Sequence, residues 1–181
     1  MKLYTKRGDD GHTDLFGGGR VAKDDSRVAS YGEVDETNAA VGVALASCAD
    51  PELISMLRRI QSDLFVLGAE LATPAQKQPS MTIGDEDVTR LEQWIDQASD
   101  EVQPLRSFIL PGGTACAAAL HFARTVCRRA ERAAVSLAGK EPLRPTVLLY
   151  LNRLSDLLFA WARLANHRAA VADIAWPGLK Q

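Results

Sequence analysis

Three arginines recur at four-residue intervals in the stretch "ARTVCRRAERAAV". Arg124, Arg128 and Arg132 would form one stripe along a helix, with Arg129 and Glu131 beside them. Guanidinium groups bind phosphate or carboxylate through paired hydrogen bonds, and no lysine takes their place here. The stripe therefore predicts either an anion-binding surface or a solvated helix face with Arg–Glu pairs.

Two other segments carry polar groups where apolar ones predominate. Asn152, Ser155 and Asp156 share one face of the otherwise apolar stretch "VLLYLNRLSDLLFAWARLAN". Such groups need hydrogen-bond partners, so they form either an inter-helix network or one wall of a polar cleft opposite the arginines. Glu33, Asp35 and Glu36, in "GEVDETNAAVG", lie beside small residues that let another helix approach, so an acid here could pair with an arginine of the first stretch.

The N-terminal segment "YTKRGDDGHTDLFGGGRVAKDD" combines glycines with hydroxyl and cationic side chains. Backbone amides in a glycine-rich turn can surround phosphate oxygens. The hydroxyls and cations come from Thr5, Lys6, Thr13 and Lys23. The Walker A pattern does not occur, and a flexible N-terminus would have a similar composition. Together with the arginine stripe, the segment favours a polyphosphate site.

Long amphipathic patterns predict the elements that position these residues. We expect five helices, over Ser26–Cys48, from Pro51 to Leu71, over Asp85–Ser99, from Gly113 or Thr114 to Leu137, and over Thr146–Arg168. Short connections and little strand signal predict an all-α, antiparallel five-helix bundle. The whole chain, 1–181, is expected to be one domain, with a nucleotide-binding loop (1–26), the bundle (27–170) and a tail (171–181).

Composition narrows the class of protein. The net charge of the 181 residues is −2, which gives no global basic signature for nucleic acid or a membrane surface. The sequence shows no secretory signal and no apolar run of transmembrane length. Cys48, Cys116 and Cys127 form no CxxC pattern, so we expect reduced thiols, a cytoplasmic protein and no metal held by protein side chains.

At this point the chain resembles a known family. The segments "YTKRGDDGHTDLFGGGRVAKDD", "GEVDETNAAVG", "FILPGGTACAAALHFARTVCRRAER" and "YLNRLSDLLFAWAR" together resemble the PduO-type ATP:cob(I)alamin adenosyltransferases, in order, from Tyr4 to about Asn166. The resemblance implies a ferritin-like bundle of the cobalamin adenosyltransferase type, usually a homotrimer with active sites between subunits. It also implies transfer of the 5′-deoxyadenosyl group of ATP to the cobalt of cob(I)alamin, which yields adenosylcobalamin and triphosphate.

The resemblance also implies roles for individual residues. ATP would be bound by Thr5, Lys6, Arg7, Gly8, Thr13 and Lys23. The phosphates of the Mg²⁺-bound nucleotide would be held by Arg128, Arg129, Glu131, Arg132 and Asn152. Among the catalytic residues, Asp35 would form an inter-subunit salt bridge with Arg128, and Phe108 would close the lower corrin face and exclude the axial base. A reductase and an adenosylcobalamin-dependent enzyme are the implied partners.

The sequence departs from the family pattern within the N-terminal segment. Arg7 stands where the family often has threonine, and Gly18–Gly19 replaces a more usual Gly-Glu. His12 and Asp14 replace small hydroxylated residues. These changes could alter nucleotide affinity or the ordering of the loop, but they leave the arginine stripe intact.

Other functions compete with this interpretation. A nucleotide or corrinoid carrier or sensor without catalysis would use the same binding groups, and turnover would distinguish the two. A ferritin-like di-iron protein needs Glu-x-x-His pairs. None occurs, since Ala118 and Leu164 stand three residues before His121 and His167. A purely structural bundle leaves the glycine-rich segment and the polar groups of the last helix unexplained.

Overall fold

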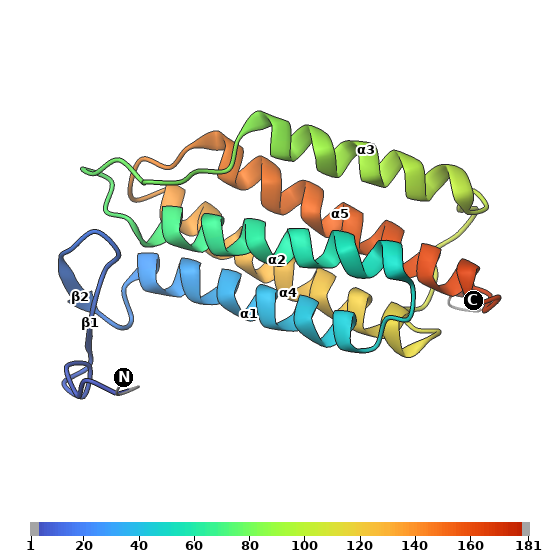
Figure 1. Cartoon of the computed structure of the whole chain (residues 1–181), viewed down its shortest axis with the longest axis horizontal. Helices are drawn as coiled ribbons and strands as arrows, with labels where there is room; N and C mark the ends of the chain where they lie inside the picture. Colours follow the sequence, from blue (N-terminus) through green and yellow to red (C-terminus); the bar gives the residue numbers. More distant parts are fainter. Residues whose placement is uncertain (1–3, 179–181) are drawn as a thin grey trace.

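The computed structural model describes residues 4–178 of the chain and contains five helices and a two-stranded hairpin (Figure 1). The elements, in chain order, are β1 (His12–Asp14), β2 (Arg20–Ala22), α1 (Ser26–Ala46), α2 (Pro51–Ala72), α3 (Asp85–Glu101), α4 (Ala115–Ala138) and α5 (Pro145–Arg168). The predicted all-α five-helix bundle is therefore confirmed, and the helix ends agree with the expected ones to within about two residues.

The helices form an antiparallel bundle in which α1 packs on both α2 and α4, α4 packs on α5, and α5 packs on α3 (Figure 1). Fully buried alanines on α4, including Ala117, Ala123 and Ala130, let α1 and α5 approach it closely. Trp161 of α5 and the leucines of α2 fill much of the remaining core. Burial of these apolar side chains provides the main stabilising term of the fold.

Local signals in the sequence define where the helices begin. Asp25 caps α1 by accepting from the Arg27 N–H (2.7 Å). Asp50 caps α2 in the same way and precedes Pro51, whose fixed φ suits the first helical turn. Thr114 caps α4 by accepting from the Ala117 N–H (3.1 Å). These caps explain why the predicted starts agree with the structure.

The N-terminal segment, which we expect to be a glycine-rich nucleotide-binding loop, contains a short two-stranded hairpin. Strands β1 and β2 pair antiparallel, with His12 opposite Ala22 and Asp14 opposite Arg20. Gly17, Gly18 and Gly19 all have φ between 84° and 102°, a conformation that favours glycine and closes the hairpin. The Lys77 ammonium, from the α2–α3 connection, donates to the Gly17 carbonyl and ties the hairpin to the bundle.

The tail returns to the connection between α3 and α4 at the other end of the bundle. The Trp176 N–H donates to the Phe108 carbonyl (2.8 Å), and the Leu110 N–H donates to the Ile174 carbonyl (2.8 Å). The Asn166 side chain accepts from the Thr114 N–H (2.9 Å) and donates to the Gly112 carbonyl (3.0 Å), which fixes the turn before α4. Residues 179–181 of the predicted tail lie outside the described residues.

Three further observations concern the thiols, membrane-spanning helices and metal-binding side chains. The cysteines are all free, with Cys116 and Cys127 buried and Cys48 partly buried. In residues 4–178, none of the helices combines the length and apolar character that crossing a bilayer requires. The same residues contain no group of three or more His, Cys, Asp or Glu side chains arranged to hold a metal ion.

Candidate active site

A hollow of about 270 Å³ opens where α4, α5 and the end of α3 meet. Arg124 and Arg128 of α4 line it on one side, and Ser155, Asp156 and Phe159 of α5 line it on the other. Ala160 and Arg163 of α5 also line it, and the rest of the wall, from α3 and the segment after it, is largely apolar. The arginines therefore face the polar side of α5 across a cleft, which is the arrangement that one of the two sequence interpretations described.

Arg124 and Arg128, unlike Arg163, have no compensating partner among residues 4–178. Among residues 4–178, no carboxylate forms an ion pair with Arg124 or Arg128, although Asp156 lines the same hollow. Burial lowers the pKa of Arg124, and the positive charge of Arg128 lowers it further. The Arg124 guanidinium lies over the Phe159 ring, 6.0 Å from its centroid. An anion in the hollow would relieve the repulsion between the two guanidinium groups.

The other arginines of α4 point elsewhere. Arg129 pairs with α1, through a 2.5 Å bond from its Nε to Glu33 and a second contact with Glu36. These hydrogen bonds raise the pKa of Arg129. Arg132 donates to the Arg128 carbonyl (3.0 Å). An acid of α1 therefore pairs with α4, as expected, and within one copy the acids involved are Glu33 and Glu36.

Glu131 and Asn152 join α4 to α5 next to the hollow. The Asn152 amide donates to Glu131 (3.1 Å) and accepts from Arg153 (2.9 Å). The Ser155 hydroxyl donates to the Asn152 carbonyl (2.9 Å). Part of the polar face of α5 is thus an inter-helix network, and part lines the cleft, so both sequence interpretations describe a portion of it.

The predicted nucleotide-binding residues gather on the hairpin and the turn before it. Lys6 has a positive φ of 62°, and the Arg7 carbonyl accepts from Arg20 (2.6 Å). The Lys23 ammonium lies close to Gly8. A Cβ atom at position 8 would be only 3.2 Å from the Lys23 Nζ. Thr5 accepts from the Arg7 N–H (3.4 Å), and Thr13 lies half-buried on β1. The segment presents cations and backbone amides at the end of the bundle.

Two of the departures from the family pattern compensate each other. The Arg7 guanidinium donates to the Asp14 carboxylate at 3.0 Å. Arg20 also lies 3.9 Å from Asp14 and pairs with Asp10 at 2.8 Å. The hairpin therefore balances the added positive charge of Arg7 with the added negative charge of Asp14.

Phe108 is one of the most exposed apolar side chains of the chain, with 79% of its surface accessible. Its ring meets Trp176 edge-on, with 6.4 Å between centroids. The sequence gives no prediction for Trp176 and Phe159, and it predicts Arg124 only as a member of the arginine stripe. The aromatic pair was beyond sequence reasoning because a contact between the tail and the α3–α4 connection leaves no periodic signal.

A single copy of the chain does not bring all the predicted residues together. The hairpin lies at one end of the bundle, and the connection that carries Phe108 lies at the other (Figure 1). They are separated by the length of α4, whose 24 residues span about 36 Å. Asp35 is exposed on α1, beside Phe16 and Phe65, and does not pair with Arg128 within the chain. The predicted site is thus divided into separate parts.

These observations define a helical bundle with an unpaired arginine cluster and a separate cationic hairpin. The family model described as Cobalamin adenosyltransferase matches residues 3–165. A corrinoid adenosyltransferase from Bacillus subtilis is 46% identical over 180 residues, which cover 97% of this chain and 92% of that protein. Corrinoid adenosyltransferase PduO from Salmonella typhimurium is also 46% identical, over 96% of this chain and 52% of that protein. The chain belongs to the cobalamin adenosyltransferase family.

Solved structures agree with this assignment. A variant PduO-type ATP:corrinoid adenosyltransferase from Lactobacillus reuteri, complexed with cobalamin and ATP, superposes with a TM-score of 0.93. It is 41% identical, and the match covers 98% of this chain and 100% of that one. Another variant from the same organism, complexed with ATP, gives a TM-score of 0.91 at 42% identity, over 96% and 99% of the two chains.

Proposed function

We propose that this protein is an ATP:corrinoid adenosyltransferase that transfers the 5′-deoxyadenosyl group of ATP to the cobalt of cob(I)alamin. Cobalt(I) supplies the electron pair of the new Co–C bond, and the C5′–O bond breaks with its electrons leaving on triphosphate. The observation that carries the proposal is the hollow with Arg124 and Arg128, which holds two guanidinium groups without a carboxylate partner in a chain of this family.

The residues present suit a leaving group of high negative charge. Guanidinium groups of Arg128 and Arg124 would stabilise the triphosphate as charge develops on it. Mg²⁺ would enter the site bound mainly to the phosphate oxygens of ATP. The described residues contain no group of three or more His, Cys, Asp or Glu side chains that could hold it. Glu131, held by Asn152, is the carboxylate we assign nearest to the bound nucleotide. Because cobalt(I) is itself a strong nucleophile, no general base is needed, and alignment of the two substrates is the main task.

The corrinoid would contact the aromatic residues at the end of the bundle. The exposed Phe108 ring, supported by Trp176, offers an apolar surface that cannot ligate cobalt. Such a surface on the lower corrin face excludes the axial base and water. Loss of the axial ligand lowers the cobalt orbital that accepts an electron, so a reductase partner could form cobalt(I) more easily. An adenosylcobalamin-dependent enzyme would receive the product.

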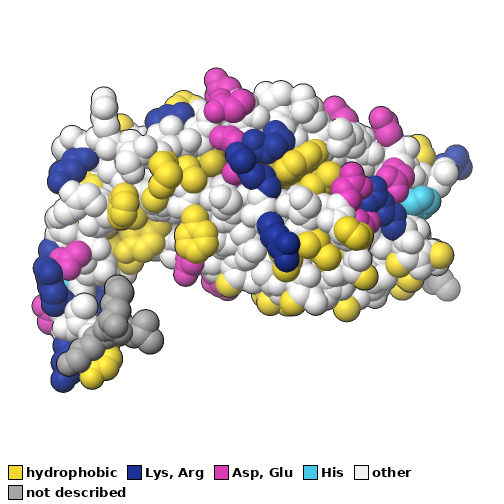
Figure 2. Space-filling model, in the orientation of Figure 1, with side chains coloured by type: hydrophobic (Ala, Val, Ile, Leu, Met, Phe, Trp, Pro, Cys, Tyr) yellow, Lys and Arg dark blue, Asp and Glu magenta, His cyan; other side chains and the backbone are white. Residues whose placement is uncertain are grey.

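We further propose that a second copy of the chain completes the active site, in a homotrimer. An apolar surface of α1, α2 and the hairpin leaves Phe65 71% exposed and Phe16 55% exposed around a cavity of about 350 Å³ (Figure 2). Asp35 lines this cavity. If α4 of a neighbour covers this surface, Asp35 meets the unpaired Arg128 of that neighbour. The hairpin of one copy then lies close to the arginines of the next.

Complementation between two inactive variants tests both the activity and the shared site. Lys23→Ala impairs the hairpin, and Arg128→Ala impairs the hollow. In a cyclic oligomer with one hairpin and one hollow per site, random mixing restores about a quarter of the sites. The variants are denatured and refolded together, and adenosylcobalamin formation from cob(I)alamin and MgATP is followed anaerobically by visible absorption.

Each outcome of this experiment has a definite meaning. Recovered turnover in the mixture supports an enzyme with sites between copies. Turnover by the wild type but none by the mixture would place each site within one copy. Absence of turnover by the wild type, with retained binding of ATP or corrinoid, would replace the enzyme with a carrier or sensor.

A further inference from the structure

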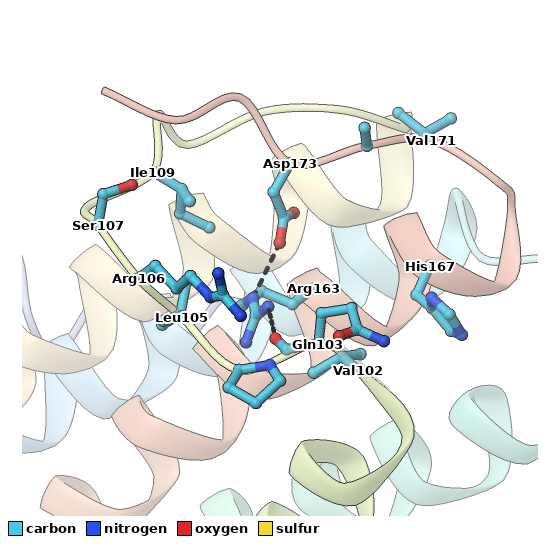
Figure 3. A pocket seen from close by; sticks show the side chains of 12 residues that line it. Val102, Gln103, Leu105, Arg106, Ser107, Ile109, Arg163, His167, Val171 and Asp173 are labelled. Carbon is cyan, nitrogen blue, oxygen red and sulfur yellow. Dashed lines mark hydrogen bonds and ion pairs between the residues drawn. The ribbon is translucent and has the colours of Figure 1, made fainter. Parts of the chain in front are cut away.

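A second cavity, of about 440 Å³, lies between the α3–α4 connection, the end of α5 and the returning tail (Figure 3). Its volume falls within the range of about 300–1,000 Å³ that small-molecule sites occupy. One part of its lining is apolar, from Val102, Pro104, Leu105, Ile109 and Val171. The remainder is polar and includes Arg106, Arg163 and His167. None of the roles assigned above uses this cavity.

The cavity carries an excess of positive charge. Figure 3 shows the side chains of Arg106 and Arg163 extending toward each other. Arg163 is neutralised by Asp173, through a 2.8 Å bond from its Nε. Arg106 has neither a hydrogen-bond nor an ion-pair partner among residues 4–178. His167 also lines the cavity. An anionic ligand would complement this set.

The walls of the cavity are fixed by buried polar contacts. Arg163, whose side chain is only 12% exposed, also donates to the Gln103 carbonyl (2.6 Å) and so joins α5 to the start of the connection. Asn166 donates to Asp173 (3.2 Å) while holding the turn at Gly112. A side chain at Gly113 could not fit, because a Cβ there would lie 2.1 Å from Asn166 Oδ1. These contacts fix the backbone on two sides of the cavity, so the main ordering on binding would be that of the exposed Arg106 side chain.

This cavity adjoins the candidate active site. Val102, Leu105 and Arg163 line both the cavity and the hollow that contains Arg128. Phe108 lies in the same connection, directly between two residues of the cavity wall, Ser107 and Ile109. A substrate that occupies the hollow or rests against Phe108 could extend one arm into the cavity.

We propose that this cavity binds the nucleotide tail of the corrinoid, with Arg106 contacting its phosphodiester and the apolar wall contacting its aromatic base. The proposal rests on the adenosyltransferase function proposed above. The peripheral groups of the cobalamin ring are neutral amides, so the phosphodiester is the anionic group that a cation can recognise. A charge-assisted hydrogen bond to it would favour the complete cobalamin over corrinoids without the tail. Arg106 is thus a specificity-determining residue.

Steady-state kinetics with two corrinoids test the proposal. Cob(I)alamin carries the tail, and cob(I)inamide lacks its phosphoribosyl base. We expect Arg106→Ala to raise KM for cob(I)alamin about tenfold, with kcat within about twofold, and to leave KM for cob(I)inamide unchanged. Arg106→Glu should have a larger effect of the same pattern, and Arg106→Lys should restore part of the affinity. Arg58→Ala, at an exposed site on α2, is the matched control.

The results separate this inference from the proposed function. A tenfold change confined to cob(I)alamin supports the tail site. Equal changes with both corrinoids, or no change with either, would overturn it. A change in KM for ATP instead would assign the cavity to phosphates of the nucleotide and would also overturn it. If the wild type converts neither corrinoid, the proposed function itself fails.

Discussion

Arginine side chains gather in two places in the bundle, and the carboxylates around them differ. Between α2, α3 and α5, the buried Asp63 accepts hydrogen bonds from Arg59 (2.9 Å), Arg90 (2.5 Å) and the Tyr150 hydroxyl (3.0 Å). Asp87 accepts from the same two arginines. We call this set the paired cluster. In the hollow between α4 and α5, by contrast, Arg124 and Arg128 have no ion-paired carboxylate within residues 4–178.

The two places also shift arginine pKa values in opposite directions. Burial opposes the charge of Arg90, but hydrogen bonds and attraction from Asp87 and Asp63 outweigh it and raise its pKa. At Arg124, burial and the neighbouring Arg128 both lower the pKa. The paired cluster thus stabilises the fold by itself, whereas the hollow lacks a negative charge. We assign the hollow with Arg124 and Arg128, and not the paired cluster, to substrate binding.

The largest expected effect comes from Arg128→Ala in the hollow. Loss of one charged group that stabilises the leaving triphosphate should lower kcat/KM about a thousandfold. The Arg128 and Asp35 side chains are both exposed, and an ion pair between such groups contributes little, so the unfolding temperature should move by less than about 2 °C. Anaerobic turnover and thermal unfolding measure the two quantities on one preparation. Unchanged turnover would show that the hollow is not the phosphate site.

Asp63→Ala in the paired cluster should have the opposite profile. It leaves Arg90 and the Tyr150 hydroxyl without their buried acceptor, and the free energy of unfolding should fall by about 3 kcal/mol. Turnover of the folded protein should stay within about twofold. Urea unfolding at fixed protein concentration gives the stability, and Asp96→Ala, at an exposed site on α3, is the control. A large loss of turnover without loss of stability would remove the distinction between the two clusters.

The helices were predictable because their signals are local. Asp25, Asp50 and Pro51 mark helix starts directly in the sequence, and apolar periodicity follows each of them. The hairpin had a local signal as well, since three successive glycines between short β-prone runs are typical of a turn. The composition of the segment predicts only a glycine-rich loop, whereas turn chemistry accounts for the hairpin that the structure contains.

The partners of charged residues were not predictable in the same way. The choice of Glu33 and Glu36 by Arg129 depends on the angle between α1 and α4, which the sequence does not encode locally. The paired cluster joins residues 27 and 87 positions apart in the chain, and no short motif marks it. Whether Asp35 meets Arg128 depends on a second copy of the chain, so that pairing stays a prediction.

The smallest expected effect concerns His121, which lies at the edge of the hollow. It is 3% exposed, its ring meets Phe159 edge-on, and neither ring nitrogen has a hydrogen-bond partner among the described residues. Burial lowers its pKa, and the charge of Arg124 lowers it further, against a smaller opposing effect of Asp173. His121 is therefore neutral in the folded protein at neutral pH and contributes to the structure rather than to binding of an anion.

Linkage fixes the sign of the pH effect. Below the unfolded-state pKa of about 6.5, the unfolded chain binds a proton at His121 that the folded chain does not, so stability falls as the pH falls through this range. When the pH falls from 7.5 to 5.5, the free energy of unfolding of His121→Leu should fall by about 1 kcal/mol less than that of the wild type. Turnover of the variant should stay within about twofold of the wild type. Urea unfolding across that range measures the slope, with His12→Gln on the exposed hairpin as the control. If the free energy of unfolding of the variant has the same slope against pH as that of the wild type, the pH dependence belongs to other groups. A loss of turnover would make His121 part of the substrate-binding hollow.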